Sequence, residues 1–153
     1  MAKIKVCETF NVPDAVLDEI ARDLITTAVE GGINYWATVS EYRWGGPGLG
    51  HSDGRAWKAG DAPYASVTVH EKDAEEGVPV DAAKMREAVV KVLTGEAKPF
   101  YTVGYGRLYR DRLTEALREV MKGTAFDRTE YDYDARDADC MMQLAVLGNV
   151  VYG

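Results

Sequence analysis

Residues 12–36 read VPDAVLDEIARDLITTAVEGGINYW, and the fold can be built outward from this stretch. Its apolar residues recur at helical spacing and form one unbroken stripe: Val16, Leu17, Ile20, Ala21, Leu24, Ile25, Ala28 and Val29. Pro13 and Asp14 suit the first turn of a helix, because a carboxylate there favours the positive end of the dipole. Gly31 and Gly32 supply a stop. The stretch therefore predicts an amphipathic helix packed on a core.

Strand patterns lie on both sides of this helix. Residues 3–10 alternate between apolar and polar side chains and predict a half-buried strand. The aromatic and β-branched run 33–44 predicts a second strand, and residues 62–71 predict a third in the same sheet. The glycine-rich segment 45–54 between them is expected to form a loop of about ten residues.

Three further helices are expected in the second half of the chain. They cover residues 81–93, about 108–122, and 134–147, each followed by a glycine that can end it. Residues 150–152 are expected to dock as a terminal strand. The order of elements predicts an α+β fold, with a small, mainly antiparallel sheet and about four helices packed against it, in a single domain spanning 1–153.

The composition limits the classes of function. The chain has 153 residues, 46% hydrophobic and 28% charged, with a net charge of −7. No apolar run approaches the roughly 20 residues that a membrane-spanning helix needs, and no signal-peptide pattern is expected, so we expect a cytoplasmic protein without a membrane partner. The negative charge disfavours nucleic acid, which needs clustered Lys and Arg. It leaves open a small nucleotide or a basic protein partner.

Aromatic residues after the first helix form a candidate ligand site. Asn34, Tyr35 and Trp36 place an amide and two large rings at the start of the predicted strand, and Trp44 follows at an even spacing that would put both indoles on one face. Aromatic rings are stacking platforms for bases and other flat ligands. Packing in the core is the alternative interpretation of these rings.

Polar residues elsewhere could complete such a site. Arg43, His51 and Arg55 border the glycine-rich segment, which could act as a lid or serve only as a hairpin connection. Asp139 and Gln143 are four residues apart, so they share one face of the last helix. They could hold a ligand or satisfy a local hydrogen-bonding need.

Catalytic patterns are scarce. His51 and His70 belong to no metal-binding or nucleophile motif, and no cofactor is expected. The carboxylates of residues 127–139 could gather a divalent ion, although their spacing is not that of an EF-hand. Cys7 and Cys140 fit no metal or redox spacing, which favours free thiols over a disulfide. The sequence therefore favours a binding protein over an enzyme.

Two sequence segments, one in each half of the chain, are distinctive. The first is EGGINYW at residues 30–36, which follows a helix ending ITTA, and the second is DADCMMQLAVLGNVVYG at residues 137–153. Both resemble a family of small uncharacterised proteins of tailed bacteriophages and prophages, in which Phe often stands at the position of Leu147. The two segments make up less than a fifth of the chain. The resemblance implies a phage or prophage origin, and hence the cytoplasm of an infected bacterium.

A phage origin favours an accessory protein that antagonises host defence by binding. The leading hypothesis is non-catalytic binding of a small nucleotide-like ligand, such as a host immune signal. In this hypothesis the ligand stacks on the rings of Tyr35, Trp36 and Trp44. It forms hydrogen bonds with Asn34, Asp139 and Gln143, and its phosphate contacts Arg43 and Arg55. The alternative is an acidic inhibitor that binds a host protein through residues 127–139. A metal-dependent hydrolase comes third, and self-association is left open.

Overall fold

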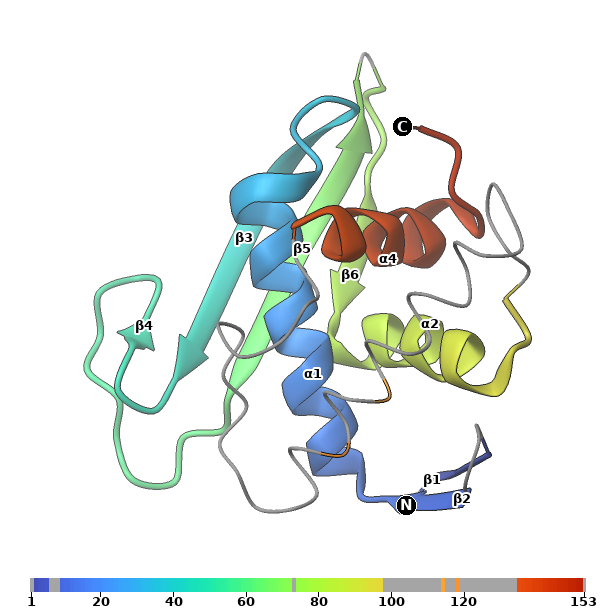
Figure 1. The fold of residues 1–153 in the computed structure, drawn as a ribbon. Helices are drawn as coiled ribbons and strands as arrows, with labels where there is room; N and C mark the ends of the chain where they lie inside the picture. Colours follow the sequence, from blue (N-terminus) through green and yellow to red (C-terminus); the bar gives the residue numbers. More distant parts are fainter. Residues whose placement is uncertain are drawn as a thin grey trace.

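The structure is a computed structural model, and it describes residues 2–5, 9–72, 74–97, 114, 118 and 135–152. These residues form an α+β fold, as predicted (Figure 1). The helical elements are α1 (Asp14–Thr27), its π-helical extension η1 (Ala28–Gly32), α2 (Ala82–Thr94) and α4 (Ala135–Leu147). The strands are β1 (Ala2–Lys5), β2 (Thr9–Val12), β3 (Ala37–Gly46), β4 (Gly50–His51), β5 (Tyr64–Glu71) and β6 (Val78–Asp81).

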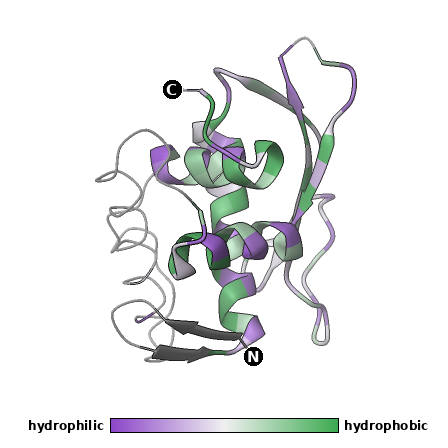
Figure 2. Ribbon diagram, turned by 90° about the vertical axis from the view of Figure 1, so that its right-hand side faces the viewer, coloured by the Kyte–Doolittle hydropathy of each residue, from purple (hydrophilic) through white to green (hydrophobic). Residues whose placement is uncertain are grey.

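A four-stranded antiparallel sheet forms one layer, with the strand order β4-β3-β5-β6. The three α-helices cover one face of this sheet, which Figure 2 shows from its edge. The core between the layers takes its apolar side chains from α1, α2, α4 and the inward-facing residues of β5. Among the described residues, no helix is long and apolar enough to cross a membrane.

Helix α1 confirms the prediction from its apolar stripe. Seven of the eight stripe residues are buried, and Val16 is half-buried at the edge of the core. The helix begins directly after Pro13 and ends in η1, where the amide of Ile33 donates to the carbonyl of Ala28 over 3.1 Å. This five-residue spacing is the mark of a π-turn, a rare element that widens the last turn of the helix.

Helix α2 is also confirmed, including its cap. The Asp81 carboxylate accepts a hydrogen bond from the amide of Lys84 over 2.9 Å, and Gly95 ends the helix with a φ of 80°. The prediction missed β6, which precedes this cap. Strand β6 is short and carries Pro79 at the sheet edge, where a strand can tolerate a residue that donates no amide hydrogen.

The described residues contain three α-helices, whereas about four were predicted. The helix expected at 108–122 lies outside the described residues, except for Thr114 and Arg118, which are both helical. The acidic residues 127–134 also lie outside them. Helix α4 confirms the last predicted helix.

The predicted strand at 3–10 is instead a separate hairpin, because β1 pairs with β2 and with no strand of the main sheet. The tail after α4 is likewise not a strand, because residues 150–152 form no regular secondary structure. The loop within segment 45–54 is shorter than expected, because part of the segment is paired. Strand β4 pairs with the end of β3 through Gly45–His51 and Gly46–Gly50, so the segment forms a hairpin connection.

A bulge in β3 changes which residues share a face of the sheet. Ser40 lies opposite Thr68 but Arg43 opposite Ser66, so Glu41 and Tyr42 together face a single residue of β5. Glu41 has a φ of 52°, in the left-handed region. The even spacing of Trp36 and Trp44 is therefore not that of a regular strand, since the bulge shifts the alternation and Trp36 precedes the strand, although both rings pack against the core.

Candidate functional site

The predicted site residues fall into two groups at opposite ends of β3. Tyr35 and Trp36 lie just before the strand, whereas Arg43 and Trp44 lie near its end. Eight residues of extended chain span roughly 25 Å. One small ligand therefore cannot contact both groups, and the single site expected from the sequence separates into two.

The first group surrounds the buried carboxylate of Asp139, and we call it the Asp139 cluster: Tyr35, Trp36, Asp139 and Gln143. The indole Nε1 of Trp36 donates to Oδ1 of Asp139 over 2.7 Å, and the hydroxyl of Tyr35 donates to Oδ2 over 2.6 Å. The amide Nε2 of Gln143 donates to Oδ1 over 3.1 Å. Asp139 is 5% exposed, so three donors surround a carboxylate that meets little water.

Gln143 connects this cluster to the C-terminal tail. Its Oε1 accepts from the amides of Val151 and Tyr152 over 2.8 and 2.9 Å, and its Nε2 donates to the carbonyl of Tyr152 over 3.2 Å. The ring of Tyr152 stacks on Trp36 with a centroid distance of 5.4 Å. These contacts fix the tail on α4 without any strand pairing.

Trp36 therefore packs as part of the core. It is 2% exposed, its ring is stacked on Tyr152 and its N–H group is bonded to Asp139. Tyr35 differs, because its side chain is 50% exposed although its hydroxyl is held by Asp139 and, over 3.2 Å, by Gln143. Burial, and next the hydrogen bond to Asp139, raise the pKa of Tyr35 far above its ordinary value, so the hydroxyl remains a donor.

The approach of η1 to α4 brings the Asp139 cluster together. Gly32 lies against the first turn of α4, where a β-carbon would come within 2.7 Å of the carbonyl oxygen of Ala135. This close contact places the residues that follow Gly32 beside Asp139, one turn further along α4. Asn34 is exposed next to the cluster.

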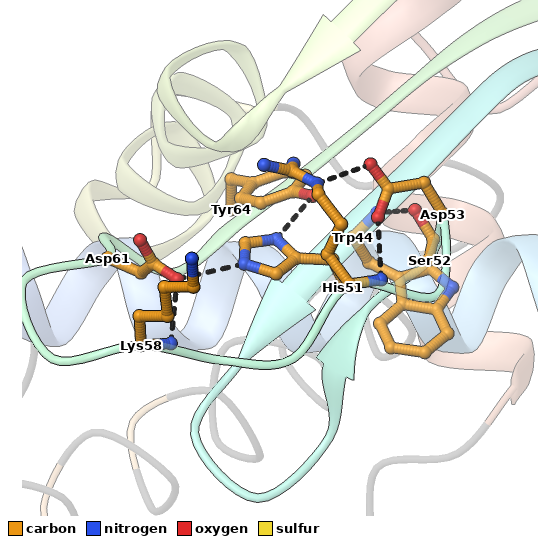
Figure 3. Close-up of polar contacts among 8 residues, drawn as sticks. Trp44, His51, Ser52, Asp53, Lys58, Asp61 and Tyr64 are labelled. Carbon is orange, nitrogen blue, oxygen red and sulfur yellow. Dashed lines mark hydrogen bonds and ion pairs between the residues drawn. The ribbon is translucent and has the colours of Figure 1, made fainter.

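A further cluster lies at the β4 end of the sheet, near the second group but outside the predicted ligand-binding residues, and we call it the His51 cluster: His51, Trp57, Asp61 and Tyr64. Figure 3 shows His51 with Asp61 and Tyr64. The Nε2 atom of His51 lies 2.9 Å from Oδ2 of Asp61, and Nδ1 lies 3.0 Å from the hydroxyl of Tyr64. The imidazole ring packs against Trp57 and Tyr64, at centroid distances of 5.1 and 5.7 Å. The cluster thus ties the segment between β4 and β5 to the sheet.

The predicted arginines have different surroundings. Arg55 donates through Nε to Oδ2 of Asp53 over 2.7 Å, and both side chains are exposed. Arg43 is exposed on β3. Trp44 is half-buried against the core, and its amide donates to Oγ of Ser52. None of these three residues reaches the Asp139 cluster.

Four residues of these clusters were not predicted from the sequence: Trp57, Asp61, Tyr64 and Tyr152. No motif indicates them, because each gains its role from a contact that depends on the hairpin or on the docked tail. Most of residues 127–139, whose carboxylates could gather a divalent ion, lie outside the described residues. Within the described part of the chain, no group of three His, Cys, Asp or Glu side chains could hold a metal. Cys140 is buried, and Cys7 lies outside the described residues.

The stability of the protein is expected to fall in acid through Asp61. The hydrogen bond from His51, and next that from the Lys58 amide, holds the pKa of Asp61 below its ordinary value of about 4. Because the folded-state pKa is the lower one, ionised Asp61 stabilises the fold above the unfolded-state pKa, and this contribution is lost as the pH falls through the folded-state pKa.

Urea midpoints at about pH 7 and about pH 3 test this expectation. Asp61→Asn should lower the midpoint at the higher pH and reduce the difference between the two. An unchanged difference in the variant would show that Asp61 does not contribute to the acid sensitivity.

The comparisons with known proteins returned no matching family model and no significant match to a curated protein or a solved structure.

Proposed function

We propose that this protein binds a small nucleotide-like ligand without catalysis, and that Tyr35 is the surface on which the base stacks. The observation that supports this proposal is the combination of exposure and rigidity at Tyr35. Half of its side chain faces solvent, yet its hydroxyl is bonded to Asp139 over 2.6 Å and to Gln143 over 3.2 Å. An exposed ring that is already fixed loses little conformational entropy when a ligand stacks on it.

Neighbouring groups suit the remaining parts of such a ligand. Asn34 is exposed and its amide can both donate and accept, as recognition of a base edge requires. The amide of Lys72 donates to the carbonyl of Trp36 over 2.9 Å, so an exposed lysine lies beside the cluster. Lys72 is a better candidate for phosphate contact than Arg43 or Arg55, which are near the far end of β3.

The role in the cell follows from the resemblance to phage proteins. A phage protein that binds a nucleotide without converting it would lower the free concentration of that nucleotide. We therefore place signalling nucleotides of the host, cyclic dinucleotides and ADP-ribose derivatives among them, first in the screen.

A titration of Tyr35 variants tests the proposal. A ligand found by thermal shift in this panel is expected to bind Tyr35→Ala about 5- to 150-fold more weakly, because stacking of one base on an aromatic ring contributes roughly 1–3 kcal/mol. Tyr35→Phe keeps the ring and should retain most of the affinity. Isothermal titration calorimetry measures both.

Trp44→Ala is the matched control, since it removes an aromatic ring at the other end of β3. It should leave the dissociation constant unchanged. The proposal is wrong if no compound in the panel raises the melting temperature, or if Tyr35→Ala binds the ligand as tightly as the unaltered protein.

A further inference from the structure

Tyr64 differs from the other described tyrosines in the partner of its hydroxyl. Tyr35, Tyr42 and Tyr152 each donate to a carboxylate, at 2.6, 3.1 and 2.8 Å. A negative charge beside the phenol opposes its ionisation. The pKa of all three tyrosines is raised. The largest cause is burial for Tyr35 and Tyr42, and the hydrogen bond to Glu71 for Tyr152. Tyr64 instead meets an imidazole nitrogen.

The partner of this imidazole determines which nitrogen can take a proton. An ionised carboxylate only accepts hydrogen bonds, so in the neutral ring Asp61 requires the hydrogen on Nε2 of His51. Nδ1 then carries a lone pair and can accept a hydrogen bond from the Tyr64 hydroxyl, which lies 3.0 Å away. Carboxylate, imidazole and hydroxyl therefore follow one another in the order found in catalytic triads, with a phenol in the place of the nucleophilic serine.

The surrounding residues hold this arrangement rigidly. The side chain of His51 is 7% exposed, and the Lys58 amide donates to the same Asp61 oxygen over 2.8 Å. Gly45 lies under the cluster on β3, where a β-carbon would come within 2.5 Å of the Tyr64 ring and 2.9 Å of Nδ1 of His51. Only glycine leaves room for the two rings to meet over the strand.

We propose that Tyr64 is a nucleophile toward activated acyl compounds, with His51 as its general base and Asp61 as a positioning residue. The phenolic oxygen attacks the acyl carbon and forms a new C–O bond. The bond from that carbon to the leaving group breaks, and the leaving group takes its electron pair. The phenolic proton passes to Nδ1 of His51, and the imidazolium is stabilised by Asp61. The product is an O-acyl tyrosine.

The first experiment treats the intact protein with limiting N-acetylimidazole near neutral pH and follows each tyrosine by peptide mass spectrometry. Tyr64 should be acetylated at least about 10-fold faster than Tyr35, since general base catalysis contributes about 100-fold or more. Exposure alone predicts the reverse order, because Tyr35 is 50% exposed whereas Tyr64 is partly buried and therefore less accessible to the reagent. Tyr64 reacting no faster than Tyr35 would overturn the proposal without any variant.

The second experiment compares Asp61→Asn with Asp53→Asn, a control in the same segment whose carboxylate bonds Arg55 and not the imidazole. Asp61→Asn should slow acetylation of Tyr64 about 10-fold and leave Tyr35 unchanged. It should also move the pH midpoint of the reaction downward, because the carboxylate that stabilises protonated His51 is gone. Asp53 acts on His51 only through space, without a hydrogen bond, so Asp53→Asn should change both values far less than Asp61→Asn does. Equal effects of the two variants would contradict the role of Asp61.

Discussion

Asp139→Ala is expected to lower the free energy of unfolding by about 3–4 kcal/mol. The substitution leaves the indole N–H of Trp36 buried without its acceptor and removes a partner from both Tyr35 and Gln143. A buried donor that loses its partner costs roughly 1–3 kcal/mol, and donors to a charged group are at the upper end. Urea denaturation followed by tryptophan fluorescence measures the change in midpoint.

Two smaller changes to the same cluster serve as controls. Tyr35→Phe removes one hydrogen bond from a half-exposed side chain and should cost only about 0.5–1.5 kcal/mol. Asp139→Asn keeps an oxygen that can accept from Trp36 and Gln143, so its effect should lie between the other two. If Asp139→Ala were no more destabilising than Tyr35→Phe, the carboxylate would not be the centre of the cluster.

The helices were predictable because their information is local. The apolar stripe of α1 and the capping aspartate of α2 each depend on residues within a few positions of one another. The strands were harder. Strand β6 has four residues and one proline, and β4 has two, so neither carries enough alternation to be recognised.

Only part of the Asp139 cluster could be predicted from the sequence. The spacing of Asp139 and Gln143 predicted that they share one helical face, and the structure shows a hydrogen bond between them. Nothing in the sequence indicates that Trp36, 103 residues away, donates to the same carboxylate. The even spacing of Trp36 and Trp44 assumed a regular strand, because a bulge in β3 cannot be seen in the spacing, yet both rings do pack against the core.

The His51 cluster could not be predicted from the sequence. It forms because β4 turns back on β3 and places His51 beside Gly45, so that Tyr64 of β5 lies on the same face of the sheet. The register between strands creates the contact, and no local pattern encodes that register. The glycine that permits it appeared in the sequence only as part of a loop.

Gly32→Ala is expected to be strongly destabilising, while Gly31→Ala is tolerated. A β-carbon at position 32 would lie 2.7 Å from the carbonyl oxygen of Ala135 and 3.3 Å from the β-carbon of Asp139. The carbonyl belongs to the backbone of α4 and cannot rotate away, so the helix must shift. Overpacking of this kind costs about 1–3 kcal/mol or more, and the shift would also pull Asp139 away from Trp36.

Gly31 provides a closely matched control for this substitution. A β-carbon at position 31 meets only the β-carbon of Ala135 at 3.8 Å, an ordinary van der Waals contact, and neither glycine has a positive φ. Both changes add one methyl group to adjacent residues of η1, so effects on the unfolded chain are nearly equal and cancel in the comparison. Thermal melts of the two variants should differ by several degrees. Equal melting temperatures would mean that the close approach of η1 to α4, which brings Tyr35 and Trp36 to Asp139, does not limit the residue at position 32.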